Sequence, residues 1–255
     1  MDSSDGFRNH DCRGAIALNN MGVSLLEQKA YLEAMETLKD SVIVMKVAFQ
    51  QESCTNFRDT SILVEEKLDR ACQRLSTQRL EADPTLIEGL RHDGGFATLQ
   101  SLVTKQDPIL SESLFPVRIE QLDDHDDIEN SLKTAIIMHN FSIAHFCMSK
   151  TPVNDEVRAR LVEGGLRLAS VSYGILSKMM SGGKNLLYEL ILRDTNVFVV
   201  AIAVLNSLVQ MLIALGSLGE AERCSEKLHQ LGALVKQIDS PEFTQSNTVA
   251  AAAAC

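Results

Sequence analysis

The chain has no tryptophan, and it has only 3 tyrosines, 9 phenylalanines and 5 prolines in 255 residues. Aromatic and β-branched residues favour sheets, whereas the leucine, alanine, methionine, glutamate and glutamine that abound here favour helices. A hydrophobic content of 45% suffices for a sizeable core. The sequence therefore predicts an all-α protein, as one elongated domain or two small ones, and excludes disorder throughout.

A concentrated positive charge is also missing. The net charge is −10, and the densest basic stretch, Arg158 to Arg167, is diluted by Glu156 and Glu163. A chain of this charge repels nucleic-acid phosphates and anionic lipids. We therefore expect neither nucleic acid nor a membrane surface as a partner, and the acidic balance favours a protein or peptide with basic residues.

The cysteines form no CxxC pair, so neither a zinc site nor a disulfide framework is indicated. The N-terminal stretch also lacks a basic region followed by an apolar one, which argues against a secretory signal. Both observations favour a reducing compartment, so we expect a cytoplasmic protein, with the nucleus as the alternative. The 6 cysteines are Cys12, Cys54, Cys72, Cys147, Cys224 and Cys255.

Motifs for catalysis and cofactor binding are missing too. Gly182-Gly183-Lys184 lacks the spacing and the Ser or Thr of a phosphate loop, and residues 123–127 lack the glycine and distal glutamate of a calcium loop. His139 and His145 are six residues apart, a spacing that places them on different faces of a helix, so they do not form a metal-binding pair. No GxSxG nucleophile motif occurs in a strand-turn-helix context. We expect no enzyme, no cofactor and no metal.

An internal repeat is present. The pattern Ala-Ile-x-x-x-Asn occurs at Ala15–Asn20, Ala135–Asn140 and Ala201–Asn206. Because Ile and Asn are four residues apart, they share one face of a helix. Repeats of this kind stack into interaction surfaces, which indicates a helical scaffold.

Helical periodicity divides the chain into a flexible N-terminus at 1–11, a helical domain at 12–239 and a disordered tail at 240–255. Three antiparallel hairpins are predicted, each opened by one copy of the repeat. Residues 31–82 form either one helix or two. Residues 84–127 are an irregular insertion that contains prolines, a Gly-Gly pair and an acidic run. Within this insertion, Leu114–Glu120 is strand-like and is the segment most suited to occupy a groove.

Residues 17–42 resemble a tetratricopeptide repeat. Leu18, Leu25 and Leu38 match its large packing positions, and Gly22 and Ala34 match positions where small residues let two helices approach closely. The other two copies match more loosely, and an irregular bundle could satisfy the same hydrophobic pattern. The resemblance implies a right-handed superhelix of hairpins that binds partner proteins.

The resemblance also implies a groove lined by the first helix of each hairpin. Candidate partner-binding side chains there would hydrogen-bond a bound peptide, or in the alternative would bond neighbouring helix ends or water. A cochaperone that clamps carboxylates is disfavoured, because Lys and Arg do not flank these positions. The candidates are Asn20, Asn140, His145, Asn206 and Gln210.

We therefore expect an adaptor or scaffold that holds a partner segment in a helical groove. One alternative is a structural module that self-associates without a peptide ligand, and the sequence leaves the oligomeric state open. A second is a membrane anchor, because Val197–Leu215 is an uncharged stretch of nearly bilayer length. Polar Asn206 and Gln210 on one face of that stretch favour a buried helix instead.

Overall fold

The computed structural model describes residues 3–50, 57–81, 114–119, 127–180 and 196–238. These residues form helices and connecting segments, with no strand among them, so the predicted all-α class is confirmed for this part of the chain. The helices are α1 (Ser3–Glu27), α2 (Tyr31–Gln50), α3 (Phe57–Glu81), α6 (Asp127–Ser149), α7 (Asp155–Met180), α9 (Asn196–Ala214) and α10 (Leu218–Ile238).

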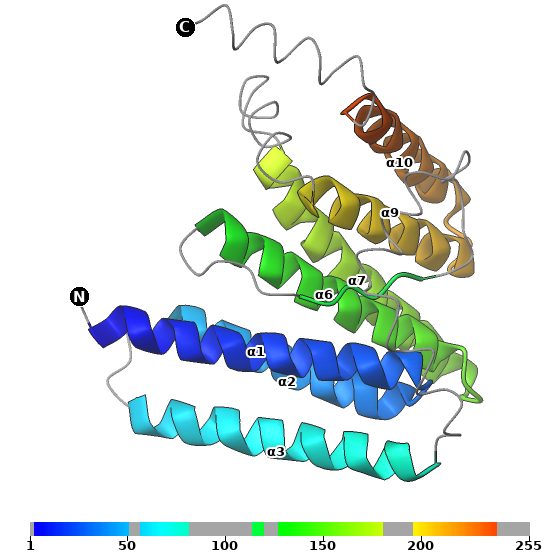
Figure 1. Ribbon diagram of the computed structural model, residues 1–255. Helices are drawn as coiled ribbons and strands as arrows, with labels where there is room; N and C mark the ends of the chain where they lie inside the picture. The colour runs from blue at the N-terminus through cyan, green and yellow to red at the C-terminus, as the bar shows by residue number, and fades with distance from the viewer. Residues whose placement is uncertain (1–2, 51–56, 82–113, 120–126, 181–195, 239–255) are drawn as a thin grey trace, which may run out of the picture.

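Six of the helices pair as successive antiparallel hairpins: α1 with α2, α6 with α7, and α9 with α10. The hairpins stack in chain order, because α2 packs against α6 and α7 packs against α9 (Figure 1). Helix α3 lies on the outer side of the first hairpin, in contact with α1 and α2. Helix α3 packs mainly against α1 and is separate from α2, so residues 31–82 contain two helices rather than one.

The first and third hairpins turn in the same way. Lys29 and Gly216 take left-handed backbone conformations, with φ of 61° and 74°. In each turn the next amide reaches back to a carbonyl five residues earlier, from Ala30 to Leu25 and from Ser217 to Leu212, at 2.9 Å. This is a helix-ending motif that glycine favours.

The first and second hairpins each contain a hydrogen bond of the same kind between their two helices. Ser41 Oγ on α2 donates to the carbonyl of Ala15 on α1 at 2.7 Å, and Ser172 Oγ on α7 donates to the carbonyl of Ala135 on α6 at 2.8 Å. Both alanines are the first residue of an Ala-Ile-x-x-x-Asn copy. The two copies therefore occupy corresponding positions in their hairpins.

Gly22 allows α1 and α2 to approach closely. A Cβ atom at this position would lie 2.5 Å from Leu38 Cγ, well inside van der Waals contact. Leu38 is fully buried, so it has little room to withdraw. Glycine at this point lets the two helices pack in register.

Helix α9 is the apolar centre of the molecule. The window Val197–Ala214 has a mean hydropathy of 2.4 and is, among the described helices, the one long and apolar enough to cross a membrane. Within this window 78% of the residues are buried by the rest of the protein, chiefly by α7 and α10. A helix enclosed in this way has the composition of a protein core.

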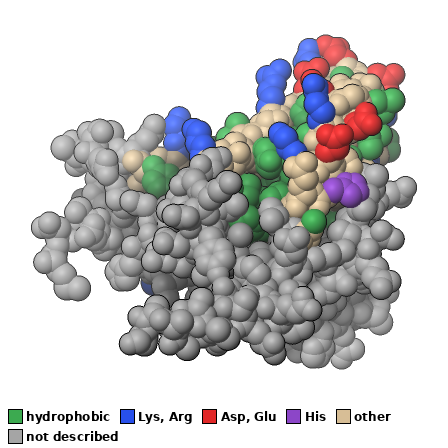
Figure 2. Space-filling view, turned by 90° about the horizontal axis from the view of Figure 1, so that it is seen from above, with side chains coloured by type: hydrophobic (Ala, Val, Ile, Leu, Met, Phe, Trp, Pro, Cys, Tyr) green, Lys and Arg blue, Asp and Glu red, His purple; other side chains and the backbone are tan. Residues whose placement is uncertain are grey.

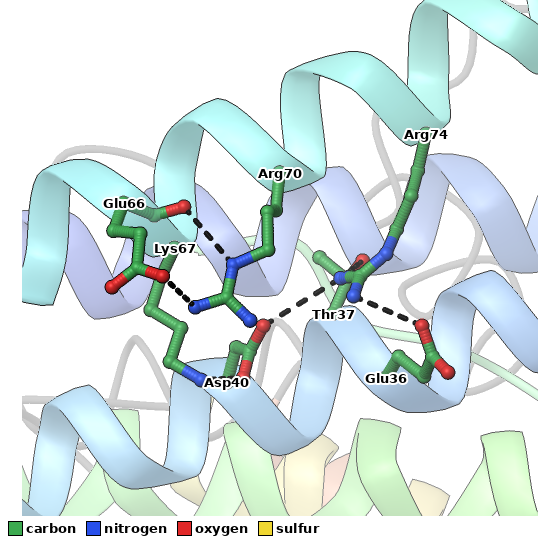
Figure 3. Close-up of polar contacts among 7 residues, drawn as sticks. All are labelled: Glu36, Thr37, Asp40, Glu66, Lys67, Arg70 and Arg74. Carbon is green, nitrogen blue, oxygen red and sulfur yellow. Dashed lines mark hydrogen bonds and ion pairs between the residues drawn. The ribbon is translucent and has the colours of Figure 1, made fainter.

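Ion pairs fasten α3 to α2 (Figure 3). Lys67 Nζ lies 2.5 Å from Asp40 Oδ1, and their side chains are 12% and 8% exposed. Arg74 adds a contact to Glu36 at 2.9 Å and a hydrogen bond to Thr37 Oγ1 at 3.1 Å. Burial of the Lys67–Asp40 pair makes each partner necessary to the other.

The terminal and inserted regions differ in how far the structure describes them. Helix α1 begins at Ser3, so it includes most of the stretch 1–11 that we predicted to be flexible. The helix can continue through this stretch because it contains no proline. Helix α6 begins at Asp127, the last residue of the predicted insertion. Most of the insertion, and the tail at 240–255, lie outside the described residues. Within the insertion, 114–119 are described, and they contain neither helix nor strand.

Candidate peptide-binding groove

The segment Leu114–Ile119 crosses α1 and α6 on the face formed by the first helices of two hairpins. We call this face the groove. The segment's main chain bonds to side chains of both helices, and Val117 and Ile119 are 0% and 3% exposed. Leu114 and Phe115 pack partly buried against the same core. A stretch without secondary structure is thus enclosed by the helices.

Asn140 binds the main chain of Val117 at both of its polar groups. The Val117 amide donates to Asn140 Oδ1 at 2.8 Å, and Asn140 Nδ2 donates to the Val117 carbonyl at 2.7 Å. The N–H and C=O of one residue point the same way only when the backbone is extended. The two bonds therefore show that the segment is extended at Val117.

Asn20 binds Ile119 in the same way. The Ile119 amide donates to Asn20 Oδ1 at 2.9 Å, and Asn20 Nδ2 donates to the Ile119 carbonyl at 2.9 Å. Asn20 and Asn140 are the last residues of the first two repeat copies. The repeat thus places two amide side chains to bind residues two apart in an extended chain.

The residue before each asparagine adds a further bond. His139 Nε2 lies 3.1 Å from the Phe115 carbonyl, and Asn19 Nδ2 lies 3.4 Å from the Val117 carbonyl. Each repeat copy therefore binds one residue at both polar groups and the carbonyl two residues earlier. Pro116, which has no N–H to satisfy, falls between the bound positions.

The two copies are also linked directly. Asn140 Nδ2 donates to Asn19 Oδ1 at 2.8 Å, and Asn19 Nδ2 donates to Asn20 Oδ1 at 3.1 Å. Asn19 and Asn140 are fully buried, while Asn20 is half-buried. Buried amides must find partners inside the protein, so this chain fixes the orientation of each side chain toward the segment.

Burial holds His139 neutral. It lowers the pKa of this imidazole from 6.5 to about 4, although the bond to Phe115 opposes the shift. A carbonyl only accepts hydrogen bonds, so Nε2 carries the proton, and Nδ1 has no hydrogen-bond partner within the described part of the chain. Protonation of Nδ1 would place an uncompensated charge in the core.

Arg118 carries the segment's charged contact. Its guanidinium donates to Glu27 Oε2 at 2.5 Å, to Ser24 Oγ at 3.1 Å and to the Asn20 carbonyl at 3.2 Å. The side chains of Arg118 and Glu27 are 27% and 28% exposed, so the pair lies at the edge of the groove. One wall of the groove thus presents a carboxylate to a basic residue.

The structure brings together two of the predicted partner-binding residues, Asn20 and Asn140. His145 lies between α6 and α7, where its ring would be 3.2 Å from a Cβ atom at Gly164, and its Nδ1 bonds the carbonyl of Phe141. Burial lowers the pKa of this imidazole. Asn206 and Gln210 lie on α9, where Asn206 ends the third repeat copy.

Four side chains of the groove were not among the predicted residues: Asn19, His139, Ser24 and Glu27. For the first two a signal existed, because each stands beside a predicted asparagine within an apolar helix. The ion pair of Glu27 with Arg118 carried no such signal, since its partners are 91 residues apart in the chain.

Charges elsewhere are mixed. Figure 2, which views the molecule from above Figure 1, shows Lys and Arg side chains among Asp and Glu side chains over its described part. On α7, Arg158 pairs with Asp155, Arg160 with Glu156, and Arg167 with Glu163. The densest basic stretch of the sequence is therefore neutralised by its own helix. Among the described residues, no group of three or more His, Cys, Asp or Glu side chains could hold a metal ion.

Comparisons with protein-family models, with curated proteins and with solved structures find no match to this chain. The groove and its contacts are the observations from which a function can be proposed.

Proposed function

We propose that the protein is a non-enzymatic scaffold or adaptor, built as a tetratricopeptide-like right-handed superhelix, that holds an extended partner segment in the groove. The observation that carries this proposal is the pair of asparagines, Asn20 and Asn140, each bonded to both polar groups of one residue in an extended chain. Such bonds recognise main chain, so they suit any extended peptide and leave selectivity to its side chains.

Three features support the tetratricopeptide-like arrangement. The hairpins stack in chain order, Gly22 provides the close helix approach, and the Ser41 and Ser172 bonds recur at corresponding positions. A superhelix of this kind turns the first helices of its hairpins toward one another. The groove lies on those helices, which is where a partner would bind.

The membrane-anchor alternative requires α9 to leave the core, which would expose the surfaces of α7 and α10 that it now covers. The acidic net charge of −10 favours a protein partner with basic residues, encountered in the cytoplasm or nucleus. Self-association without a peptide ligand would leave the buried amides bonded only to the chain's own segment, whereas an adaptor would use the same main-chain bonds to hold a partner.

The test is affinity capture from a cell extract with quantitative mass spectrometry, followed by direct binding of overlapping peptides from each captured protein. We expect Asn20→Ala, whose side chain is half-buried, to reduce capture of one shared partner at least tenfold. The matched control is Arg70→Ala, which removes a polar side chain on α3 outside the groove. Equal capture by wild type and Asn20→Ala, or binding by no peptide of the captured proteins, would contradict the proposal.

A further inference from the structure

The main-chain hydrogen bonds that hold the segment Leu114–Ile119 do not depend on its sequence. Asn19, Asn20, Asn140 and His139 all bond its main-chain N–H and C=O groups. Every extended peptide carries the same groups at alternate residues. The bonds that hold the segment could therefore be made equally well by another chain.

Two features of the segment do depend on sequence. Val117 and Ile119 bury branched aliphatic side chains in the core, and Arg118 between them donates to Glu27 and Ser24 on α1. A chain that replaces the segment must match this pattern. It would carry branched aliphatic residues two positions apart with an arginine between them.

The groove cannot remain empty at low cost. Asn19, Asn140 and His139 are each 0% exposed and point polar atoms at the segment. Each buried polar atom that loses its partner costs about 1–3 kcal/mol. Departure of the segment therefore favours immediate replacement, by water at the half-buried end near Asn20 or by another main chain.

We propose that Leu114–Ile119 is an intramolecular ligand that occupies the groove until a partner segment of the same pattern, aliphatic-Arg-aliphatic and extended, displaces it. This inference rests on the proposed function and adds both the partner's chemistry and its regulation. Because the segment belongs to the same chain, it competes at an effective concentration of about 1 mM. If the segment and a free peptide of the same sequence both have an intrinsic Kd of about 10 μM, the segment fills the groove about 100 times more often than it leaves it open. The free peptide would then bind the wild type about 100-fold more weakly than it binds an open groove.

The test measures fluorescence anisotropy of a labelled peptide that copies residues 113–120, titrated with full-length protein. Arg118→Glu places a carboxylate beside Glu27, which weakens the internal ligand and leaves the groove unchanged. We expect this variant to bind the peptide at least tenfold more tightly than wild type. A peptide in which Glu replaces the arginine should not gain affinity for it.

The control is the charge-swapped double variant Arg118→Glu/Glu27→Arg, in which the internal pair is restored. It should bind the arginine peptide no more tightly than wild type. Equal binding by wild type and Arg118→Glu would overturn the internal-ligand inference and leave the groove as a binding site. No binding to a folded Arg118→Glu protein would overturn both the inference and the proposed function.

Hydrogen exchange on the wild type provides a second measurement that needs no variant. We expect the Val117 and Ile119 amides to exchange through local opening, faster than amides in the centres of α1 and α6. Exchange only through global unfolding would make the segment a fixed part of the fold and overturn the inference. Light scattering completes the test, because a dimer formed by exchanging segments would make a second copy the occupant and contradict the intramolecular assignment.

Discussion

The replacement of Asn140 by alanine tests whether the groove contributes to stability as its geometry requires. The change removes three hydrogen bonds, to the Val117 amide at 2.8 Å, to its carbonyl at 2.7 Å and to Asn19 Oδ1 at 2.8 Å. Val117 is 0% exposed, so water cannot take the place of the lost amide. Two buried main-chain groups and the Oδ1 atom of the buried Asn19 are left to find new partners.

Each buried group without a partner costs about 1–3 kcal/mol. The Val117 carbonyl keeps a long contact to Asn19 at 3.4 Å, which places its cost at the lower end. With about 1 kcal/mol more for Asn19 Oδ1, we expect Asn140→Ala to lower the free energy of unfolding by about 3–5 kcal/mol. Asn140→Asp should cost more, because a carboxylate would face the Val117 carbonyl and Asn19 Oδ1 without a proton to donate.

The matched control is Asn20→Ala, which removes an equivalent pair of bonds to Ile119, both 2.9 Å long. Because Asn20 is half-buried, water can replace its amide, and the expected loss is about 1 kcal/mol. Urea unfolding followed by far-ultraviolet circular dichroism measures both values at a constant m-value. If the two variants lose the same stability, the reasoning from burial is refuted.

Three further predictions follow from the packing and the charges. Gly22→Ala should destabilise by about 1–2 kcal/mol in thermal unfolding, because its methyl group meets Leu38 at 2.5 Å and the gain in helix propensity offsets only part of the strain. Asp40→Asn should cost about 2–3 kcal/mol in urea unfolding, because it leaves the Lys67 charge buried. Folding lowers the pKa of His139 from 6.5 to about 4. Between these two pH values the unfolded state binds more protons than the folded state, so the free energy of unfolding should decline by about 3 kcal/mol as the pH falls through this range.

Each of these predictions has a control within the chain. Gly174→Ala in α7 should stabilise by up to about 1 kcal/mol, since a Cβ atom there meets nothing within 4 Å. Arg70→Ala breaks an exposed pair with Glu66 and should change stability by less than about 0.5 kcal/mol. His139→Gln should flatten the pH profile measured by urea unfolding. A profile unchanged by His139→Gln would show that other groups cause the decline.

The sequence was sufficient to predict the helical hairpins, because amphipathic periodicity is a local property of each segment. It also pointed to Leu114–Glu120 and to Asn20 and Asn140, because an extended segment and two amides on apolar helices are visible without coordinates. The return of the chain between α2 and α3 could not be decided, because residues 31–82 contain neither Gly nor Pro.

Other parts of the site depended on distant contacts. His145 was grouped with the asparagines by its place on the same predicted helix, but its position against α7 depends on how two helices pack. The pairing of Arg118 with Glu27 requires the path of a segment that joins the groove from 91 residues away. Periodicity describes one helix at a time, so neither contact could be read from it.

The alternate spacing of the bound residues has a consequence for how ligands can slide. Phe115 bonds His139, and Val117 and Ile119 bond the asparagines, so a shift by one residue would turn every bonded group toward the opposite side. A shift by two residues would bring equivalent groups back to the same amides. A ligand should therefore bind the groove only in registers that differ from one another by an even number of residues.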